Sequence, residues 1–464
     1  MSTTKYDVAI IGGGPGGYVA AIRAAQLGKK PVVIEKDRPG GVCLNWGCIP
    51  TKSLLKNAEL IFTLQHAEDF GISCDNLSFD ISKAVDRSRK AAETLAGGVE
   101  FLLKKNNVKI VKGHGRLKSA SVVEVTDAEG QASEIHAESV VVSTGSRTKA
   151  IPVIPVDGSR IIDSTDAMQL REIPTSMTII GGGAIGVEFA YFFAAYGTKV
   201  TIVEMLPHLL PLEDEEISEQ LEKSFAKLGI SIMTGARVEK AEAGSGGTTV
   251  AISRDNKTET IYSDITLMAV GRDPNSEDIG LEELGVETDR GFIKVNDGYA
   301  TNVPGVYAIG DVVGAPLLAH VASAEGVNLM ERLAGHETNP IDYGNIPSCT
   351  YCQPQVASVG LTEKAAAEQG EIKVFKMPYR SSGKAVAVGH VEGMVKLIAD
   401  AKYGEILGAH IIGYDATELI AELCTARTLE TTAAEIRQTI HAHPTLSELV
   451  MEAAAGIDGE AIHI

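Results

Sequence analysis

The sequence has little cysteine, little positive charge and no long hydrophobic run. Six cysteines in 464 residues exclude a disulfide-dense scaffold. The 42 Lys and Arg residues stand against 61 Asp and Glu, and the net charge of −19 disfavours nucleic acid and anionic membranes as main partners. No apolar stretch reaches the roughly 18 residues that a transmembrane helix needs, so we expect no membrane span.

The N-terminal segment lacks the basic region and the small-residue cleavage site of a signal peptide, so we expect none. The expected location is the cytoplasm or, if the chain is a processed form, the mitochondrial matrix or plastid stroma. In such a reducing compartment a disulfide is more often catalytic than structural.

Glycine, by contrast, is abundant, with 48 residues, or about 10% against an ordinary ~7%. Two glycine-rich segments fit the pattern G-x-G-x-x-G, and they begin at Gly12 and Gly181. Each follows a short apolar strand and precedes an alanine-rich amphipathic helix and a second strand that ends in Glu. The interval from the first glycine to that Glu is 23 residues in both copies (35−12 and 204−181). The repeat predicts two βαβ units that bind dinucleotides.

Each unit needs a tight turn, a close backbone approach to a pyrophosphate and close packing of helix on strand. The glycines that meet these needs, in that order, are Gly12, Gly14 and Gly17 in the first unit and Gly181, Gly183 and Gly186 in the second. Glu35 and Glu204 would hold ribose hydroxyls. Glu204 would repel a 2′-phosphate and Met205 supplies no compensating cation, so we expect NAD rather than NADP.

Further apolar strands also end in glycine, as expected where parallel strands meet a ligand; they are Val140–Thr144, Ile265–Val270 and Val306–Ile309. After Asn345 the pattern changes to alternating strands and then to a helical region, Ala416–Ile440. The expected strands are Gln355–Val359, Lys373–Pro378, Met394–Ala399 and Ile406–Ile412. We therefore predict an α/β protein with two Rossmann-like domains and a C-terminal α+β domain.

Cys43 and Cys48 frame the segment most suggestive of chemistry. On a regular helix their Cα atoms would lie ~8.6 Å apart, beyond the roughly 4.4–6.8 Å of a disulfide. Gly47 could supply the distortion that brings them together, ahead of an expected helix Thr51–Leu60. Lys52 is a candidate cation for this site. The alternative is a pair of buried thiols without a redox role.

A second candidate pair lies near the C-terminus, where His443 precedes Glu448 by five residues across a Pro-containing turn. An imidazole–carboxylate pair raises the basicity of the histidine and fixes its tautomer. A plain surface loop is the alternative, and His441 has no role that the sequence distinguishes.

Together, the two glycine units, the CxxxxC segment Cys43–Cys48, Gly310-Asp311 and the terminal His-Pro-Thr-x-x-Glu resemble the pyridine nucleotide–disulfide oxidoreductases over essentially the whole chain. The resemblance implies tightly bound, non-covalent FAD on the first unit, NAD on the second, and a redox disulfide between Cys43 and Cys48. It also implies a homodimer in which His443 and Glu448 serve the other subunit's disulfide.

The resemblance assigns further residues to the cofactors. Asp311 would bind the ribityl chain, Ala319 would lie near the flavin ring, and Lys52 would pair with Glu188 near flavin N5. Other expected cofactor positions are Thr144, Gly145 and Ser146, where the chain leaves the FAD domain, and, more weakly, Gly115, Val238 and Gly271. The implied domains are 1–148 for FAD, 149–271 for NAD, 272–344 for a central domain returning to FAD, and 345–464 for dimerisation.

Within the family, the sequence is similar to the branch that oxidises dihydrolipoamide. This implies as partners the lipoyl domain and the subunit-binding domain of a 2-oxo acid dehydrogenase acyltransferase. A glutathione-type reductase is an alternative, but Glu204-Met205 lacks the arginine expected for NADPH. A non-catalytic, NADH-sensing flavoprotein is another, and it would need neither Cys43–Cys48 nor His443.

The remaining four cysteines are expected to be inert. Cys349 and Cys352 would project to opposite sides of one strand, although a second redox pair or a metal half-site is the alternative. Cys74 and Cys424 are expected to be isolated buried thiols.

Overall fold

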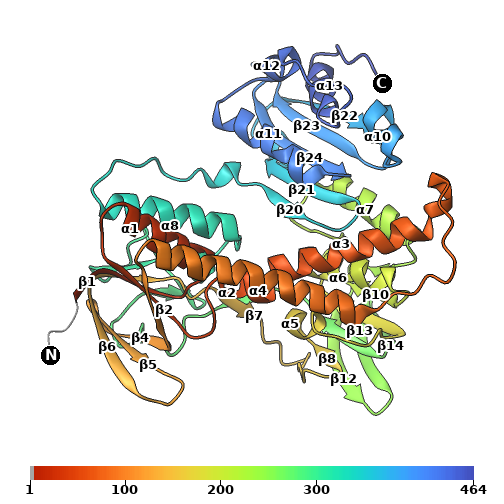
Figure 1. Ribbon diagram of the computed structural model, residues 1–464. Coiled ribbons are helices and arrows are strands. Elements are labelled where there is room, and N and C mark those ends of the chain that lie inside the picture. Colours follow the sequence, from red (N-terminus) through yellow and green to blue (C-terminus); the bar gives the residue numbers. More distant parts are fainter. Residues whose placement is uncertain (1–4) are drawn as a thin grey trace. The chain divides into compact units, whose positions relative to one another are not determined.

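The computed structural model describes residues 5–464, which fall into two compact units (Figure 1). Of the described residues, unit 1 contains 5–53, Lys83–Ala150 and Gly271–Ile341, and unit 2 contains Leu54–Ser82, Ile151–Val270 and Asp342–Ile464. The α/β class is confirmed, whereas the four domain boundaries stay predictions.

Unit 1 is built on a seven-stranded sheet in the order β3-β2-β1-β6-β5-β4, with β19 also paired to β6. The strands of this sheet are β1 (Lys5–Ile11), β2 (Pro31–Glu35), β3 (Lys109–Lys112), β4 (His114–Ser119), β5 (Val122–Thr126), β6 (Ala132–Val142) and β19 (Val306–Ala308). Two small pairs join β7 (Ser146–Thr148) to β16 (Arg272–Pro274) and β17 (Thr288–Asp289) to β18 (Phe292–Ile293). The helices are α1 (Pro15–Gln26), α2 (Gly41–Trp46), η2 (Gly310–Val313), α8 (Ala319–Leu333) and, from Lys83 onward, α4 (Ile81–Lys105).

β1 lies at the centre of this sheet because its side chains are apolar on both faces. Val8 and Ile10 pack into the cluster that contains the small residues of α1, whereas Ala9 and Ile11 pack into the opposite cluster. α1 and α8 run side by side over the first face (Figure 1). β1 is parallel to both of its neighbours, β2 and β6, and the strand order reverses at β1. In open α/β sheets, ligands bind at such a reversal, beside the carboxyl ends of the strands.

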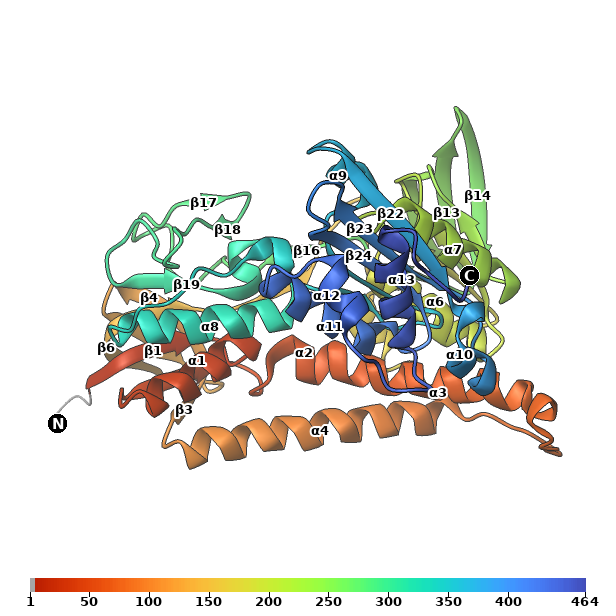
Figure 2. The same ribbon diagram turned by 90° about the horizontal axis from the view of Figure 1, so that it is seen from above.

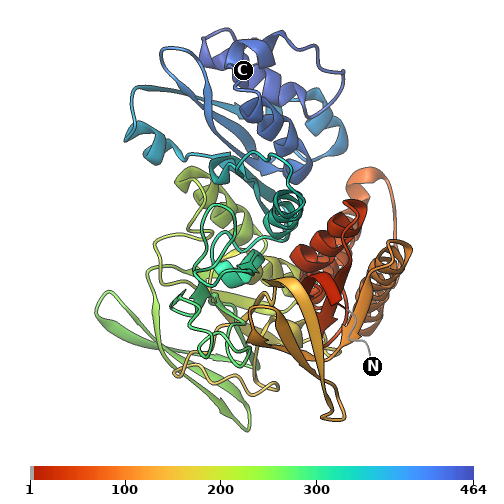
Figure 3. The same ribbon diagram turned by 90° about the vertical axis from the view of Figure 1, so that its left-hand side faces the viewer.

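Unit 2 repeats this plan in a five-stranded sheet with the order β11-β10-β9-β15-β8. The strands are β8 (Ile161–Ile162), β9 (Ser176–Ile180), β10 (Lys199–Val203), β11 (Ser231–Met233) and β15 (Ile265–Met268), and all pair in parallel. The associated helices are α5 (Ser164–Ala167), α6 (Ala184–Ala195) and α7 (Glu215–Lys227). A long antiparallel meander, green in Figure 3, is formed by β12 (Arg237–Gly244), β13 (Gly247–Arg254) and β14 (Lys257–Ser263).

The C-terminal part of unit 2 is an antiparallel sheet in the order β20-β21-β24-β23-β22. Its strands β22, β23 and β24 are labelled in Figure 2. The four predicted strands are confirmed as β21 (Gln355–Gly360), β22 (Ile372–Pro378), β23 (Met394–Asp400) and β24 (Ile406–Gly413), and β20 (Ser348–Thr350) is additional. The helical region expected over Ala416–Ile440 is confirmed, and it consists of two helices, α11 (Ala416–Thr428) and α12 (Ala433–Gln438). Between them Glu430 has a positive φ of 52°, and Thr432 starts a new capping box.

Helix α3 (Cys48–Gln65) begins in unit 1 and continues into unit 2. The other remaining elements belong to unit 2. They are η1 (Ala67–Phe70), η3 (Tyr343–Asn345), α9 (Glu363–Ala367), η4 (Tyr379–Ser381), α10 (Gly383–Val388) and α13 (Glu448–Ile457).

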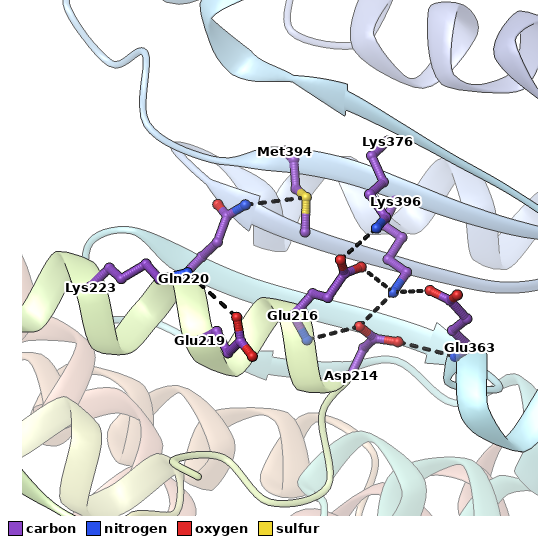
Figure 4. Close-up of polar contacts among 9 residues, drawn as sticks. All are labelled: Asp214, Glu216, Glu219, Gln220, Lys223, Glu363, Lys376, Met394 and Lys396. Atoms are coloured by element: carbon purple, nitrogen blue, oxygen red, sulfur yellow. Dashed lines mark hydrogen bonds and ion pairs between the residues drawn. The ribbon is translucent and has the colours of Figure 1, made fainter.

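A buried ionic network holds the start of α7 to the C-terminal sheet (Figure 4). Lys396 on β23 is 1% exposed, and its Nζ lies 2.8 Å from Asp214 Oδ1, 2.6 Å from Glu216 Oε2 and 2.6 Å from Glu363 Oε2. Burial alone would lower the pKa of Lys396, but the hydrogen bonds to these carboxylates raise it to about 12. The buried cation is therefore fully compensated, as burial of a charge requires.

Candidate functional site

The first glycine-rich turn joins β1 to α1. Gly12 has a φ of +104°, and a Cβ there would lie 2.2 Å from the Ser143 carbonyl oxygen. A Cβ on Gly17 would lie 1.9 Å from the Gly12 carbonyl oxygen, so the helix can pass the turn only with glycine there. Glu35 accepts hydrogen bonds from the amides of Gly13 (2.6 Å) and Asp37 (2.8 Å). The carboxylate at the end of β2 therefore fixes the turn.

The second turn, between β9 and α6, repeats each of these contacts. Gly181 has a φ of +109°, and a Cβ on Gly186 would lie 1.9 Å from the Gly181 carbonyl oxygen. Glu204, directly after β10, accepts hydrogen bonds from the amides of Gly182 (2.6 Å) and Leu206 (2.7 Å). The sequence repeat is thus confirmed as a structural repeat.

Both turns fit the pyrophosphate of a dinucleotide. Gly14 and Gly183 are the N-cap residues of α1 and α6, and neither helix receives a side-chain cap. The first amides of each helix are therefore not capped by a side chain, and the helix dipole favours an anion there. A Cβ on Gly183 would point into open space, and one on Gly14 would meet only the Gly41 Cα, at 3.9 Å.

Two weaker candidates lie beneath these turns. Gly115 is on β4, where a Cβ would lie 3.0 Å from Ile34 Cγ2 and 3.1 Å from Ile11 Cγ2. Val238 on β12 packs against the apolar cluster that contains Ile180, the last residue before the second turn. Both positions therefore support the strand ends that carry the turns.

Ser146 and Asp311, 165 residues apart, meet in unit 1. Ser146 Oγ donates a hydrogen bond to Asp311 Oδ2 at 2.5 Å and accepts one from Arg272 Nε at 2.6 Å. Arg272 was not among the residues predicted from the sequence, although its position directly after the strand-end glycine Gly271 could have marked it.

The other predicted residues of this region surround the same segment. Thr144 Oγ1 donates to the Asn275 carbonyl at 2.7 Å, and Asn275 Nδ2 donates to the Thr144 carbonyl at 2.9 Å. Gly145 and Gly271 both have a φ of +71°, and Ala319 is the first residue of α8. Asn275 was also missed, because only the folded chain brings it to Thr144.

The two cysteines of the CxxxxC segment lie on either side of a break between helices. Cys43 is in α2, Gly47 ends that helix with φ −152° and ψ −112°, and α3 begins at Cys48. The expected distortion at Gly47 is confirmed. The helix expected from Thr51 starts three residues earlier, because Pro50 lies in the first turn, where proline is tolerated.

Both cysteines are thiols, and each is close enough to affect the other. The hydrogen bond with Cys48, burial and the neighbouring Cys48 charge raise the pKa of Cys43, whereas the Lys52 ammonium opposes this shift. Burial and the proximity of Cys43 also raise the pKa of Tyr18 on α1. The raised pKa of Cys43 therefore favours its protonated form.

In unit 2, Glu188 is a buried residue of α6 and accepts a hydrogen bond from the Tyr351 amide at 3.0 Å. The pairing of Glu188 with Lys52 stays a prediction.

The His443–Glu448 pair forms as the spacing suggested. His443 Nδ1 lies 2.9 Å from Glu448 Oε1, and the His443 side chain is 78% exposed. Glu448 Oε2 accepts the Thr445 amide at 2.9 Å. Burial would raise the pKa of Glu448, but the Thr445 amide and His443 outweigh it and lower the pKa. The carboxylate therefore orients an exposed imidazole.

The neighbouring histidine has a different environment. His441 Nε2 lies 2.6 Å from Glu422 Oε1, and the His441 side chain is only 6% exposed. Its Nδ1 lies 2.9 Å from the Thr439 carbonyl, so both ring nitrogens are engaged and the residue is structural.

Two expectations about the remaining cysteines are wrong. Cys74 is exposed rather than buried, because it lies in an irregular loop outside the core. Cys349 and Cys352 do not share a strand, because β20 ends at Thr350 and leaves Cys352 beyond it. Cys352 is fully buried, and its thiol donates a hydrogen bond to the Pro354 carbonyl at 3.2 Å. Cys424 is half-buried.

Within residues 5–464, no group of three or more His, Cys, Asp or Glu side chains is placed to hold a metal ion. Over the same residues, no helix combines the length and hydrophobicity needed to cross a membrane.

Comparison with known proteins identifies the family to which this chain belongs. The family model described as pyridine nucleotide-disulphide oxidoreductase matches residues 6–326, and the model of that family's dimerisation domain matches residues 346–454. The chain therefore belongs to the pyridine nucleotide-disulphide oxidoreductases, and the expected dimerisation domain is confirmed.

Individual members of this family are similar to the chain over almost their full length. The chain is 47% identical over 452 residues to the dihydrolipoyl dehydrogenase of Chlorobaculum tepidum, covering 97% of this chain and 96% of that one. It is 45% identical over 461 residues to the dihydrolipoyl dehydrogenase of Zymomonas mobilis, covering 99% of each. Among solved structures, LpdA from Mycobacterium tuberculosis matches with a TM-score of 0.91 at 28% identity, over 98% of this chain and 100% of LpdA.

Proposed function

We propose that this protein oxidises protein-bound dihydrolipoamide to lipoamide and reduces NAD+ to NADH, using FAD and a redox disulfide between Cys43 and Cys48. The observation that carries this proposal is the pair of thiols on the two sides of the Gly47 break, in a chain with two dinucleotide turns. Relatives named dihydrolipoyl dehydrogenase, which match over almost their full lengths, support the same assignment.

The first turn is the proposed FAD site, because the redox segment follows directly from it. FAD, when bound, supplies a carrier for two electrons between the dithiol and the nicotinamide. On this chain, the amides at Gly14 would hold the pyrophosphate, Glu35 the ribose, and Asp311 the ribityl chain. Ser146 fixes the Asp311 carboxylate for this purpose through a direct hydrogen bond, and Arg272 holds the Ser146 hydroxyl in turn.

The second turn is the proposed NAD site. The Glu204 carboxylate is held by two backbone amides and would accept hydrogen bonds from ribose hydroxyls. Met205 beside it is 63% exposed and offers no positive charge for a 2′-phosphate. These two residues support NAD over NADP.

The proposed chemistry begins with a proton transfer. Glu448 is bonded to Nδ1 of His443, which leaves Nε2 to remove the proton from a substrate thiol. The resulting thiolate attacks Cys43 Sγ, the Cys43–Cys48 bond breaks, and Cys48 leaves as a thiolate. The second substrate thiol then gives up its proton to the departing Cys43 sulfur and attacks the substrate sulfur bound to Cys43, which forms lipoamide and breaks the bond to Cys43. The raised pKa of Cys43 favours its release as the protonated thiol.

The base and the disulfide would come from different subunits of a homodimer. His443 lies 395 residues after Cys48 (443−48), in the part of the chain that matches the dimerisation domain. Its side chain is exposed and already oriented, so it is available to a second copy of the chain.

The proposed partners are a lipoyl domain, which carries the substrate, and the basic subunit-binding domain of a 2-oxo acid dehydrogenase acyltransferase. The net charge of −19 would favour such docking, and raised salt should weaken it. The proposed location is the cytoplasm, a reducing compartment in which a disulfide is more often catalytic than structural.

The test is NADH formation from dihydrolipoamide by the FAD-loaded protein. Cys48→Ser should abolish turnover with FAD retained, and His443→Gln should lower kcat/KM by about 100-fold to 10,000-fold. His463→Gln is the matched control, because His463 is also exposed and bonded to a carboxylate, Glu452. Activity with glutathione disulfide and NADPH instead would overturn the substrate assignment. NADH binding without turnover of any disulfide would identify a non-catalytic flavoprotein.

A further inference from the structure

Helix α4 contacts the redox segment through side chains that no cofactor or substrate role requires. The Arg89 guanidinium carbon lies 4.2 Å from the centre of the Trp46 ring, and Arg89 Nη2 donates a hydrogen bond to the Asn45 carbonyl at 2.6 Å. Asn45 and Trp46 are the last two residues of α2, directly before the break at Gly47. Arg89 therefore binds the backbone between the two cysteines.

A second arginine of α4 binds the chain on the far side of Cys48. Arg87 Nη1 donates to the Ser53 carbonyl at 3.1 Å and to Ser53 Oγ at 2.7 Å. The chain is thus held on both sides of Cys48 by two arginines from a single turn of α4. The α2 end is fixed further by Asn45 Nδ2, which donates to the Gly41 carbonyl at 3.0 Å, and by Trp46 Nε1, which donates to Asp37 Oδ2 at 3.3 Å.

The position of Arg89 has an energetic cost for the folded protein. Burial lowers the pKa of Arg89, with Glu93 opposing, and Arg89 Nη1 is buried without a hydrogen-bond partner. An unsatisfied buried donor is unfavourable and is expected to persist where the remaining contacts serve a purpose. The purpose that the geometry offers is to fix the backbone of the cysteine pair.

We infer that Arg89 is a positioning residue that holds Asn45–Trp46 in the geometry that lets Cys43 and Cys48 form their disulfide. The inference rests on the proposed redox role of this pair. Two cysteines five residues apart reach disulfide distance only where the helix is broken. A brace that keeps the break in place lowers the conformational freedom of the dithiol, so it favours the disulfide.

The contribution of Arg89 is geometric rather than electrostatic. Lys52, not Arg89, is the cation that acts on the Cys43 charge. A flat guanidinium can stack on an indole ring and bond a carbonyl at the same time, which a lysine ammonium cannot do. Arg89→Lys should therefore restore little, although it keeps the positive charge.

The experiment equilibrates the FAD-loaded protein with a dithiothreitol redox buffer and measures the oxidised fraction of the Cys43–Cys48 peptide by alkylation and mass spectrometry. Arg89→Ala should make disulfide formation about tenfold less favourable, which corresponds to a potential about 30 mV more oxidising. Lys90→Ala, which removes an exposed cation from the same helix, should leave the equilibrium unchanged. Trp46→Phe should shift it in the same direction, and adding Arg89→Ala should then add less than it does alone.

Trp46 is the only tryptophan of the chain, so its fluorescence reports directly on this contact. Its emission should change in Arg89→Ala and stay unchanged in Lys90→Ala. FAD content and melting temperature identify any variant that fails to fold, and Arg89→Gln then provides a second neutral variant. An unchanged equilibrium in both folded neutral variants, or full restoration by Arg89→Lys, would overturn the inference. Because no lipoamide is used, a shifted equilibrium in a protein that cannot oxidise dihydrolipoamide would refute the proposed function alone.

Discussion

In both glycine-rich turns, backbone amides bind the carboxylate of the following Glu, Glu35 or Glu204, in the same way. The segments that follow these two glutamates, however, take different paths. After Glu35, the Gly40 amide donates to the Gly13 carbonyl at 2.8 Å, and α2 then begins with the redox segment. After Glu204, the Leu210 amide donates to the Gly182 carbonyl at 2.8 Å, and the chain continues to the N-terminus of α7. The same carbonyl of each turn is therefore capped by the returning chain.

The residues of the returning chain explain the difference. Gly40 and Gly41 have positive φ angles, and a Cβ on Gly41 would lie 2.7 Å from the Gly14 Cα, so the first segment passes close to its turn. Leu209 and Leu210 of the second segment are buried, and the following Asp214 and Glu216 bind Lys396 (Figure 4). One copy of the βαβ unit thus has the cysteine pair Cys43 and Cys48 beside its turn, whereas the other is anchored to the C-terminal sheet.

The largest effect should come from a methyl group on the third glycine of either turn. Gly17→Ala and Gly186→Ala each place a Cβ 1.9 Å from a backbone oxygen, which should cost about 4 kcal/mol or more. We expect Gly17→Ala to lose FAD, and Gly186→Ala to lose NADH binding with FAD retained, as measured by absorbance and fluorescence titration. Gly97→Ala in α4, where a Cβ meets nothing within 4 Å, is the control and should be neutral or stabilising. Loss of FAD in both turn variants would contradict the separate roles.

Removing the anchor of the second unit should have the next largest effect. Lys396→Met leaves three carboxylates without their buried cation and should lower the free energy of unfolding by about 3–5 kcal/mol. Lys373→Met is the control, because Lys373 on the same sheet forms a half-exposed pair with Asp458 that is worth less than about 1 kcal/mol. Urea unfolding measures both.

Lys396→Met should also make the free energy of unfolding depend less on pH in the acidic range. Burial would raise the pKa of Asp214 and of Glu216, but their hydrogen bonds to lysine outweigh it and lower both values. Their contribution is therefore present above the ordinary carboxyl pKa of about 4 and is lost as the pH falls through the lowered values. The raised pKa of Lys396 places the alkaline loss near a pH of about 12. An equal difference between wild type and Lys396→Met at pH of about 7 and about 2 would refute this assignment.

A smaller and more selective effect should follow from neutralising each acid. Glu35→Gln and Glu204→Gln keep the shape but weaken two amide hydrogen bonds, for a loss of about 1.5–3 kcal/mol. We expect weaker FAD retention in the first variant, and NADH affinity reduced about tenfold or more in the second. Glu138→Gln, which alters only an exposed pair with Lys5, should change neither. Equal effects of both variants on both ligands would mean that the turns are not specialised.

The sequence predicted the two turns well because their function requires glycine and acid at fixed local spacing. It also predicted the His443–Glu448 contact, which spans five residues. It could not predict the contacts of Ser146 with Asp311 or of Arg89 with Trp46, because these depend on how distant segments pack. The exposure of Cys74 was missed for a related reason, since burial of a single residue depends on its loop rather than on its type.

The smallest effect should test the coenzyme preference of the second turn. In the first unit Glu35 is followed by Lys36, whereas in the second Glu204 is followed by Met205, which is 63% exposed. Met205→Arg would place a solvent-exposed cation near a 2′-phosphate, and such a contact is worth about 0.2–1 kcal/mol. We therefore expect the KM for NADP+ to fall only about twofold to fivefold while Glu204 remains, and adding Glu204→Ala should lower it further. If Met205→Arg alone converted the protein to NADP+, the charge of Glu204 would not be what excludes the phosphate.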